Sequence, residues 1–158
     1  MVKPLISVIT PTYNRGHLLP RVWQSLMQQT FKNFEWIVVD DGSTDNTQKI
    51  ISSFADSRIR YIRLPENRRP NAARNEGVRA SHTPYLVFLD SDDELVPEAL
   101  EVIYKEWRDL NDETVGVIAF RCQKAATGQL VGRIEGERVK LGYKDVICER
   151  FAKGEFLM

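Results

Sequence analysis

The sequence has little of several features that would place a protein in a special class. It contains only two cysteines, Cys122 and Cys148, in 158 residues, and their separation matches neither a disulfide framework nor a Cys/His metal site. We therefore expect both to be reduced, partly buried thiols. Excess charge is also absent, because 22 basic and 22 acidic residues cancel. Such a chain has no general attraction for nucleic acid or for an anionic membrane, so charge-based binding must come from local clusters.

Long apolar stretches are missing as well. The first residues, MVKPLISVIT, lack the apolar core of a signal peptide. Apolar runs such as residues 85–89 are far shorter than the ~20 residues that a membrane span requires. We expect no transmembrane segment in this chain and a cytoplasmic location, with peripheral attachment at the inner face of a membrane left open. The glycine patterns GxGxxG and GxxxxGK[ST] are absent too, which argues against a dinucleotide fingerprint or a P-loop.

The apolar residues that are present alternate between strand and helix patterns. Short β-branched runs predict strands at residues 5–10, 35–40, 58–64, 85–89 and 114–120. Apolar residues at helical spacing predict helices at 18–26, 43–54, 70–81 and 97–110. Since strand-helix-strand units place their strands in parallel, the pattern predicts a Rossmann-like, three-layer α/β fold with a mainly parallel central sheet. Further along, the pattern weakens to a predicted hairpin at 123–141 and a helix at 143–152.

In a parallel α/β sheet, ligands bind beyond the carboxyl ends of the strands, where the strand order reverses. That rule selects three loops, at residues 11–16, 40–45 and 90–94. Most residues of these loops are polar or charged. We therefore expect the chemistry of the protein to be concentrated there.

The strongest local signal is the acidic run Asp90-Ser91-Asp92-Asp93-Glu94. Neighbouring carboxylates repel one another unless a cation or solvent lies between them, and Mg²⁺ or Mn²⁺ bridging to a diphosphate favours such oxygens. A solvated acidic turn before Pro97 is the alternative interpretation. A calcium loop of the EF-hand type is disfavoured, because its sixth position requires glycine and holds Leu95.

Three other motifs each have two interpretations. The carboxylates of Asp40-Asp41-Gly42-Ser43 can accept hydrogen bonds from a base or a ribose, with Ser43 or Thr44 capping the following helix. The structural alternative for this motif is that Asp45 only complements the helix dipole. Tyr13 offers a ring for base stacking, with packing in the core as the alternative. Arg74 can direct its guanidinium to a phosphate or form a surface ion pair.

Taken in order, these motifs resemble family-2 inverting glycosyltransferases of the GT-A fold. The matching runs are S-V-I-T-P-T-Y-N-R, Q-T-F-K-N-F-E-W-I-V-V-D-D-G-S-T-D, A-A-R-N-E-G and Y-L-V-F-L-D-S-D-D, which cover roughly residues 5–110. The resemblance implies transfer of a sugar, with inversion, from a nucleotide-diphosphate sugar to a glycan or lipid-linked acceptor. It also implies a UDP-sugar as donor and Mn²⁺ or Mg²⁺ as cofactor.

The resemblance further implies a role for individual residues that bind the nucleotide. Pro11, Thr12 and Tyr13 would line the nucleobase pocket. Asp41, the second acid of its motif, would accept a hydrogen bond from the uracil N–H. Arg74 would lie beside the nucleotide.

Asp90-Ser91-Asp92 would be the family's DxD motif, with Asp90 and Ser91 on the nucleotide sugar and Asp92 on the metal. An inverting displacement also needs a carboxylate that takes the acceptor's proton, and the later carboxylates lie in no base motif: Glu135, Glu137, Asp145, Glu149 and Glu155. We expect residues 1–110 to bind the nucleotide sugar, residues 111–158 to begin the acceptor side, and the base to lie beyond Met158. A non-catalytic nucleotide-sugar-binding module is the competing class.

Overall fold

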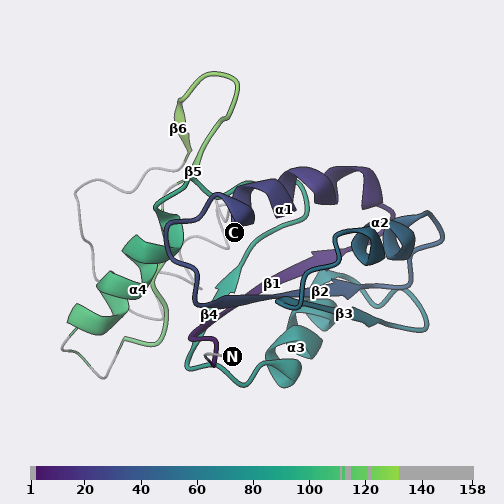
Figure 1. Ribbon diagram of the computed structural model, residues 1–158, viewed down its shortest axis with the longest axis horizontal. Coiled ribbons are helices and arrows are strands. Elements are labelled where there is room, and N and C mark those ends of the chain that lie inside the picture. The colour runs from purple at the N-terminus through teal and green to yellow at the C-terminus, as the bar shows by residue number, and fades with distance from the viewer. Residues whose placement is uncertain (1–2, 111, 113–114, 121, 132–158) are drawn as a thin grey trace, which may run out of the picture. The chain divides into compact units, whose positions relative to one another are not determined.

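A sheet of four parallel strands forms the centre of the computed structural model, which describes residues 3–110, 112, 115–120 and 122–131 (Figure 1). The chain divides into two units, Met1–Asn111 and Asp112–Met158, and the sheet belongs to the first. Its strands are β1 (Ile6–Thr12), β2 (Phe34–Asp40), β3 (Ile59–Arg63) and β4 (Tyr85–Phe88). Their spatial order is β3-β2-β1-β4, and every neighbouring pair is parallel. The predicted α/β class with a mainly parallel sheet is therefore confirmed.

Helices follow each strand and cover both faces of the sheet (Figure 1). They are the short 3-10 helix η1 (Gly16–Leu18), α1 (Leu19–Met27), α2 (Thr47–Ser53), α3 (Pro70–Ala80) and α4 (Ala99–Asp109). Buried residues of α1, α2 and α4 share one apolar cluster with the sheet, whereas α3 packs against the other face. This arrangement gives the predicted three layers. Within the described residues, no helix is long and apolar enough to cross a membrane.

The apolar runs of the two central strands are continuous because both of their faces are covered. Alternate residues point to opposite faces, so Val8 and Trp36 pack toward α1 while Ile9 and Val39 pack toward α3. The indole of Trp36 stacks on Trp23 of α1 with ring centroids 5.5 Å apart. The core therefore fixes the position of β1 and β2, whose carboxyl ends carry two of the predicted motifs.

Helix α3 approaches β1 most closely at Gly77. A Cβ atom built on this glycine would lie 2.4 Å from Cγ2 of Ile9 and 3.4 Å from Cγ2 of Val39. Real Cβ atoms do not come so close, so the helix can rest on the strand only because residue 77 has no side chain. This contact sets the distance between the sheet and the helix that carries Arg74.

The described part of the second unit contains a short antiparallel hairpin. Its strands are β5 (Cys122–Gln123) and β6 (Leu130–Val131), which overlap the predicted hairpin at 123–141. Cys122 is exposed, so its predicted partial burial is wrong. Both residues of β5 are exposed, and β5 pairs only with β6 within the described part of the chain. Cys148 and the predicted helix at 143–152 lie outside the described residues.

The strand predicted at 114–120 is wrong for residues 115–120, which have no regular secondary structure. Their sequence is apolar, and Val117 is 81% exposed. An apolar run becomes a strand only when a neighbouring strand supplies partners for its backbone N–H and C=O groups. None of the strands in the described ranges pairs with this segment.

Replacement of Gly77 by alanine tests the close approach of α3. Helix propensity alone would make Gly77→Ala stabilising by about 1 kcal/mol. We expect the opposite sign, a loss of about 1–3 kcal/mol of unfolding free energy, because the new methyl group overlaps Ile9. Urea-induced unfolding measures the change. Asn75→Ala, an exposed position in the same helix, is the matched control and should change stability by no more than about 0.5 kcal/mol. A more stable Gly77→Ala protein would show that the helix can move away from the sheet.

Candidate functional site

A pocket of about 480 Å³ lies at the carboxyl ends of the strands, within the size range of small-molecule sites. Its lining residues are Pro11, Thr12, Tyr13, Arg15, Asp41, Asn67, Pro70, Arg74, Asp90, Ser91 and Asp92. All eight residues that the sequence motifs selected are among them. The strand order reverses between β1 and β4, and the loops after both strands contribute to the pocket. Its location therefore follows the rule for open parallel sheets.

The last residue of β1 contributes a hydroxyl, and the first residue after it an aromatic ring. Thr12 is 3% exposed, and its Oγ1 is a buried side-chain oxygen that has no hydrogen-bond partner in the described part of the chain. The side chain of Tyr13 is 43% exposed, so the alternative that it packs in the core is wrong. An open aromatic ring and an unpaired hydroxyl in one pocket are suited to a flat, polar ring.

This loop is tied to the loop after β2 by the side chain and backbone of Asn14. The Asn14 N–H donates to Oγ of Ser43 at 2.8 Å, and Asn14 Oδ1 accepts from the backbone N–H of Thr44 at 2.8 Å and of Asp45 at 3.3 Å. Asn14 has a φ of 53°, a left-handed conformation that asparagine tolerates better than most residues. The two loops therefore behave as one hydrogen-bonded unit.

Asp45 joins this unit to α2. Its carboxylate accepts from the backbone N–H of Thr47 at 3.0 Å and of Gly16 at 3.1 Å. Burial by itself would raise the pKa of Asp45, but these hydrogen bonds and that of the Thr47 hydroxyl lower it overall. The predicted capping of α2 by Ser43 or Thr44 is therefore wrong. The hydroxyl of Ser43 accepts from the N–H of Asn14, and the first N–H of α2, that of Thr47, donates to Asp45.

The two adjacent acids at the end of β2 have different roles. Asp40 is fully buried, and its oxygens accept from the backbone N–H of Ser43 at 2.8 Å and from the hydroxyl of Tyr61. Burial and the contact with Asp40 raise the pKa of Tyr61. Asp41 instead lines the pocket, and its Oδ1 accepts from the backbone N–H of Arg68 at 2.8 Å. Asp41 is thus the acid placed to meet a ligand, whereas Asp40 holds the structure beneath it.

Gly42 brings the segment after β3 to the pocket. Its φ is +79°, and a Cβ atom there would lie 2.8 Å from the backbone carbon of Glu66. Only glycine combines this conformation with this approach. Asn67 and Pro70 consequently line the pocket, although the sequence motifs did not select them. Both residues follow the third predicted strand, whose carboxyl end lies at the same edge of the sheet, and this position could have identified them from the sequence.

Two arginines and three aspartates lie among the lining residues, and four of these charges form ion pairs. Nη2 of Arg74 lies 2.7 Å from Oδ1 of Asp90, and Nη1 of Arg15 lies 2.8 Å from Oδ2 of Asp92. Arg74 therefore forms the ion pair that was one of its two interpretations, but it does so inside the pocket. Arg15 was part of the quoted motif and received no role from it.

The acidic loop concentrates negative charge at the pocket. Burial, followed by the charges of Asp92 and Asp90, raises the pKa of Asp93. No group of three or more His, Cys, Asp or Glu side chains in the described ranges is arranged to hold a metal ion. The residues present suit a magnesium or manganese ion that takes one or two carboxylates from the protein and its other oxygens from a diphosphate.

Residues of α1 and of the segment after it are hydrogen-bonded to the residues that follow the acidic loop, from Leu95 to Leu100. Gln29 is fully buried, and its Nε2 donates to the carbonyl oxygens of Ser25 at 3.0 Å and Val96 at 2.8 Å. Its Oε1 accepts from the backbone N–H of Leu100 at 3.0 Å, and Ser25 Oγ accepts from that of Leu95 at 3.2 Å. A buried network of this kind fixes where the loop leaves the pocket.

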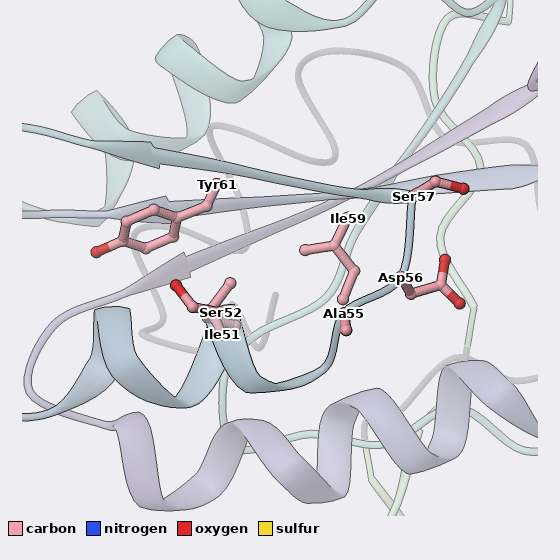
Figure 2. A pocket seen from close by; sticks show the side chains of 7 residues that line it. All are labelled: Ile51, Ser52, Ala55, Asp56, Ser57, Ile59 and Tyr61. Carbon is pink, nitrogen blue, oxygen red and sulfur yellow. The ribbon is translucent and has the colours of Figure 1, made fainter.

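A second hollow, of about 270 Å³, lies between α2 and β3 (Figure 2). Its lining residues are Ile51, Ser52, Ala55, Asp56, Ser57, Ile59 and Tyr61. Asp56 pairs with Arg58 at 2.9 Å, and the hydroxyl of Tyr61 is bonded to Asp40. These residues belong to α2, to the segment that follows it and to the beginning and middle of β3, so the hollow does not lie at the carboxyl ends of the strands. The larger pocket does, and it is therefore the candidate site.

Known proteins resemble the chain over the region that builds this pocket. The family model of glycosyl transferase family 2 matches residues 7–150. A GalNAc(5)-diNAcBac-PP-undecaprenol beta-1,3-glucosyltransferase of Campylobacter jejuni is 32% identical over 161 residues, which cover 97% of this chain and 50% of that protein.

Solved structures resemble it as well. A structure of S. aureus TarS 1-349 in complex with UDP-GlcNAc has a TM-score of 0.64 and 28% identity, and the match covers 75% of this chain and 37% of TarS. The mannosyltransferase PcManGT from Pyrobaculum calidifontis, in complex with GDP-Man and Mn²⁺, has a TM-score of 0.61 and 26% identity, over 73% of this chain and 35% of the other.

The match to this chain thus spans half or less of the length of each of these three relatives. The structural neighbours are glycosyltransferases of the GT-A fold, which confirms the fold that the motifs implied. Because the family model covers most of the sequence, the chain belongs to glycosyl transferase family 2.

Proposed function

We propose that this chain supplies the donor-binding part of a metal-dependent, inverting glycosyltransferase that uses a UDP-sugar. The observation that carries the proposal is the single pocket that gathers an open aromatic ring, an unpaired hydroxyl and three aspartates at the carboxyl edge of the sheet. Residues 1–110 form the donor-binding subdomain in this proposal, and residues 111–158 begin the acceptor side.

The loops after β1 and β2 bind the nucleobase. Tyr13 stacks on the uracil ring, beside Pro11, and the hydroxyl of Thr12 gains its missing hydrogen bond from the ligand. Asp41 accepts from the uracil N–H, because an ionised carboxylate is an acceptor at both oxygens and Arg68 occupies only one of them. Neighbouring groups thus recognise one flat ring from its face and its edge.

The remaining residues of the pocket bind the ribose and the diphosphate. Asp90 and Ser91 face the ribose and sugar, and Asp90 also orients the guanidinium of Arg74 beside the nucleotide. Asp92 holds the metal ion. When bound, Mn²⁺ or Mg²⁺ supplies Lewis-acid stabilisation to the negative charge on the departing diphosphate. Support for a metal comes from the crowded carboxylates of the loop and from the Mn²⁺ named with the mannosyltransferase PcManGT.

The acceptor and the general base complete the proposed reaction. The C. jejuni relative is named for an undecaprenol-linked acceptor, which supports a glycan or lipid-linked acceptor here and a cytoplasmic site at the inner face of a membrane. An inverting displacement needs a base that takes the acceptor's proton. The later carboxylates considered for this role, Glu135, Glu137, Asp145, Glu149 and Glu155, lie outside the described residues, as does any base beyond Met158.

The first test is a thermal-shift measurement of UDP with and without Mn²⁺. A ligand of the native state at a hundredfold excess over its Kd adds about 2.7 kcal/mol of stability. We expect UDP with Mn²⁺ to raise the melting temperature more than UDP with a chelator, and Asp92→Ala to remove that difference. Glu94→Ala, in the same loop but paired with Arg21 outside the pocket lining, should keep it. Equal stabilisation with Mn²⁺ and with chelator in the wild-type chain would remove the metal from the proposal.

Replacement of Thr12 by valine separates ligand binding from packing. Valine has nearly the same shape, and the replaced hydroxyl has no protein partner, so the unfolding free energy should stay equal or rise. The affinity for UDP, measured by calorimetry, should fall by roughly two- to tenfold, as expected for one neutral hydrogen bond. A more stable variant with unchanged affinity would mean that the hydroxyl does not touch the nucleotide.

Replacement of Asp41 by asparagine tests how the base is recognised. Uracil presents an N–H at the ring position where cytosine presents an acceptor, so we expect the wild-type chain to prefer UDP to CDP. Asp41→Asn keeps an oxygen for the N–H of Arg68 but adds a donor, and should reduce the UDP preference by roughly five- to a hundredfold. Competition binding gives the ratio of affinities. Asp56→Asn, at the second hollow, is the control and should leave the ratio of UDP to CDP affinity unchanged. An unchanged ratio in Asp41→Asn would mean that the nucleobase does not bind at Asp41.

A further inference from the structure

The ion pair between Arg15 and Asp92 occupies the carboxylate that the proposed function gives to the metal. Nη1 of Arg15 lies 2.8 Å from Oδ2 of Asp92, and both residues line the pocket. A guanidinium and a divalent cation repel each other and compete for the same oxygens. A metal ion that takes Oδ2 of Asp92 therefore requires the guanidinium of Arg15 to leave, and a metal ion on the other oxygen is repelled by the positive charge beside it.

The two ion pairs of the pocket differ in how readily they can open. The side chains of Arg15 and Asp92 are 47% and 52% exposed, whereas those of Arg74 and Asp90 are 16% and 31% exposed. A half-exposed pair is screened by water and contributes little to stability. A more buried pair is costlier to separate, because the partner left behind is a poorly hydrated charge without a counter-ion. Arg15 is thus the cation that can move, and Arg74 is the one that stays.

The backbone on both sides of Arg15 is fixed, so only its side chain is free to move. The Asn14 N–H is bonded to Ser43, and the Gly16 N–H is bonded to the carboxylate of Asp45 at 3.1 Å. Because the backbone of Arg15 is fixed, its guanidinium remains in the pocket when it leaves Asp92. It can then form paired hydrogen bonds to phosphate oxygens, for which its planar shape is suited.

We propose that Arg15 is the counter-ion that Asp92 exchanges for a metal ion, and that the released guanidinium pairs with the diphosphate of the donor. This inference rests on the proposed function, since it takes Asp92 as the metal ligand. It has a thermodynamic consequence. The nucleotide gives Arg15 a new partner and so promotes metal binding, and by linkage the metal promotes nucleotide binding to the same degree. Arg15 makes metal and donor bind together more readily than either binds alone.

Arg15→Gln tests the exchange through two affinities that should change in opposite directions. Free Mn²⁺, followed by electron paramagnetic resonance without nucleotide, should bind roughly two- to fivefold more tightly, because Asp92 no longer has a competing cation. UDP, followed by calorimetry at saturating Mn²⁺, should bind about tenfold more weakly, because a charge-assisted contact to phosphate is lost. Arg15→Lys, which keeps the charge but not the planar fork, should restore Mn²⁺ binding to the wild-type level and UDP binding only in part.

Arg21→Gln is the matched control. Arg21 pairs with Glu94 in the same acidic loop, with side-chain exposures of 55% and 45%, and does not line the pocket. Neither affinity should change in this variant. If Arg15→Gln weakened Mn²⁺ binding as well as UDP binding, Arg15 would be a structural support of the loop, and the exchange would be wrong. Unchanged affinities in Arg15→Gln would also overturn it.

Failure of the proposed function is visible separately, in the wild-type chain. If wild-type protein binds UDP equally well with Mn²⁺ and with chelator, Asp92 has no metal and the exchange fails with it. If wild-type protein shows the Mn²⁺ dependence and Arg15→Gln does not show the opposite changes, only the exchange fails. Unfolding curves of each variant establish that all comparisons are made on folded protein.

Discussion

The parallel pairing of β1 with β2 on one side and with β4 on the other is the constraint on which the site depends. Thr12 pairs with Asp40 at the last step of the β1–β2 register, and Ile9 pairs with Phe88 in the β1–β4 register. Parallel strands end at the same edge, so the residues that follow them meet in space although they lie up to about 80 positions apart in the sequence. The pocket is therefore a consequence of strand direction and order. Packing on both faces, including the contact of α3 at Gly77, holds those strands in place.

Around the pocket, some polar residues support the structure and others are left for a ligand. Asp40, Asn14, Asp45 and Gln29 spend their side-chain oxygens on hydrogen bonds within the protein. These bonds are hardest to break at Asp40 and Gln29, which are fully buried, because each broken bond there leaves an unpaired polar group. Tyr13, by contrast, presents an open ring, and the buried hydroxyl of Thr12 beside it has no partner in the described part of the chain. A rigid framework around a few groups without protein partners favours specific binding, because the site loses little conformational entropy when the ligand binds.

The charges of the pocket are balanced in pairs, and this affects how a ligand must bind. A diphosphate and a divalent cation bring opposite charges into a site that already contains Arg15–Asp92 and Arg74–Asp90. In the proposed exchange, a metal ion or a diphosphate alone has to compete with the Arg15–Asp92 pair, whereas both together offer each member of that pair a new partner. The Arg74–Asp90 pair stays closed.

The sequence by itself determined the fold class and the loops of the site, because apolar periodicity and strand ends are local properties. Its resemblance to family-2 glycosyltransferases selected the eight residues that the structure gathers in the pocket. Tertiary structure supplied the reason why Asp41 and not Asp40 lines the pocket, since Asp40 is held by Tyr61 from another strand. It also brought two further residues to the site. Asn67 reaches the pocket because Gly42 allows its segment to approach, and Arg15 is held there by its ion pair with Asp92. The strand predicted at 114–120 was wrong for residues 115–120 for the same reason. A strand needs a neighbour with free hydrogen-bonding groups, and no pattern within one segment reveals whether that neighbour exists.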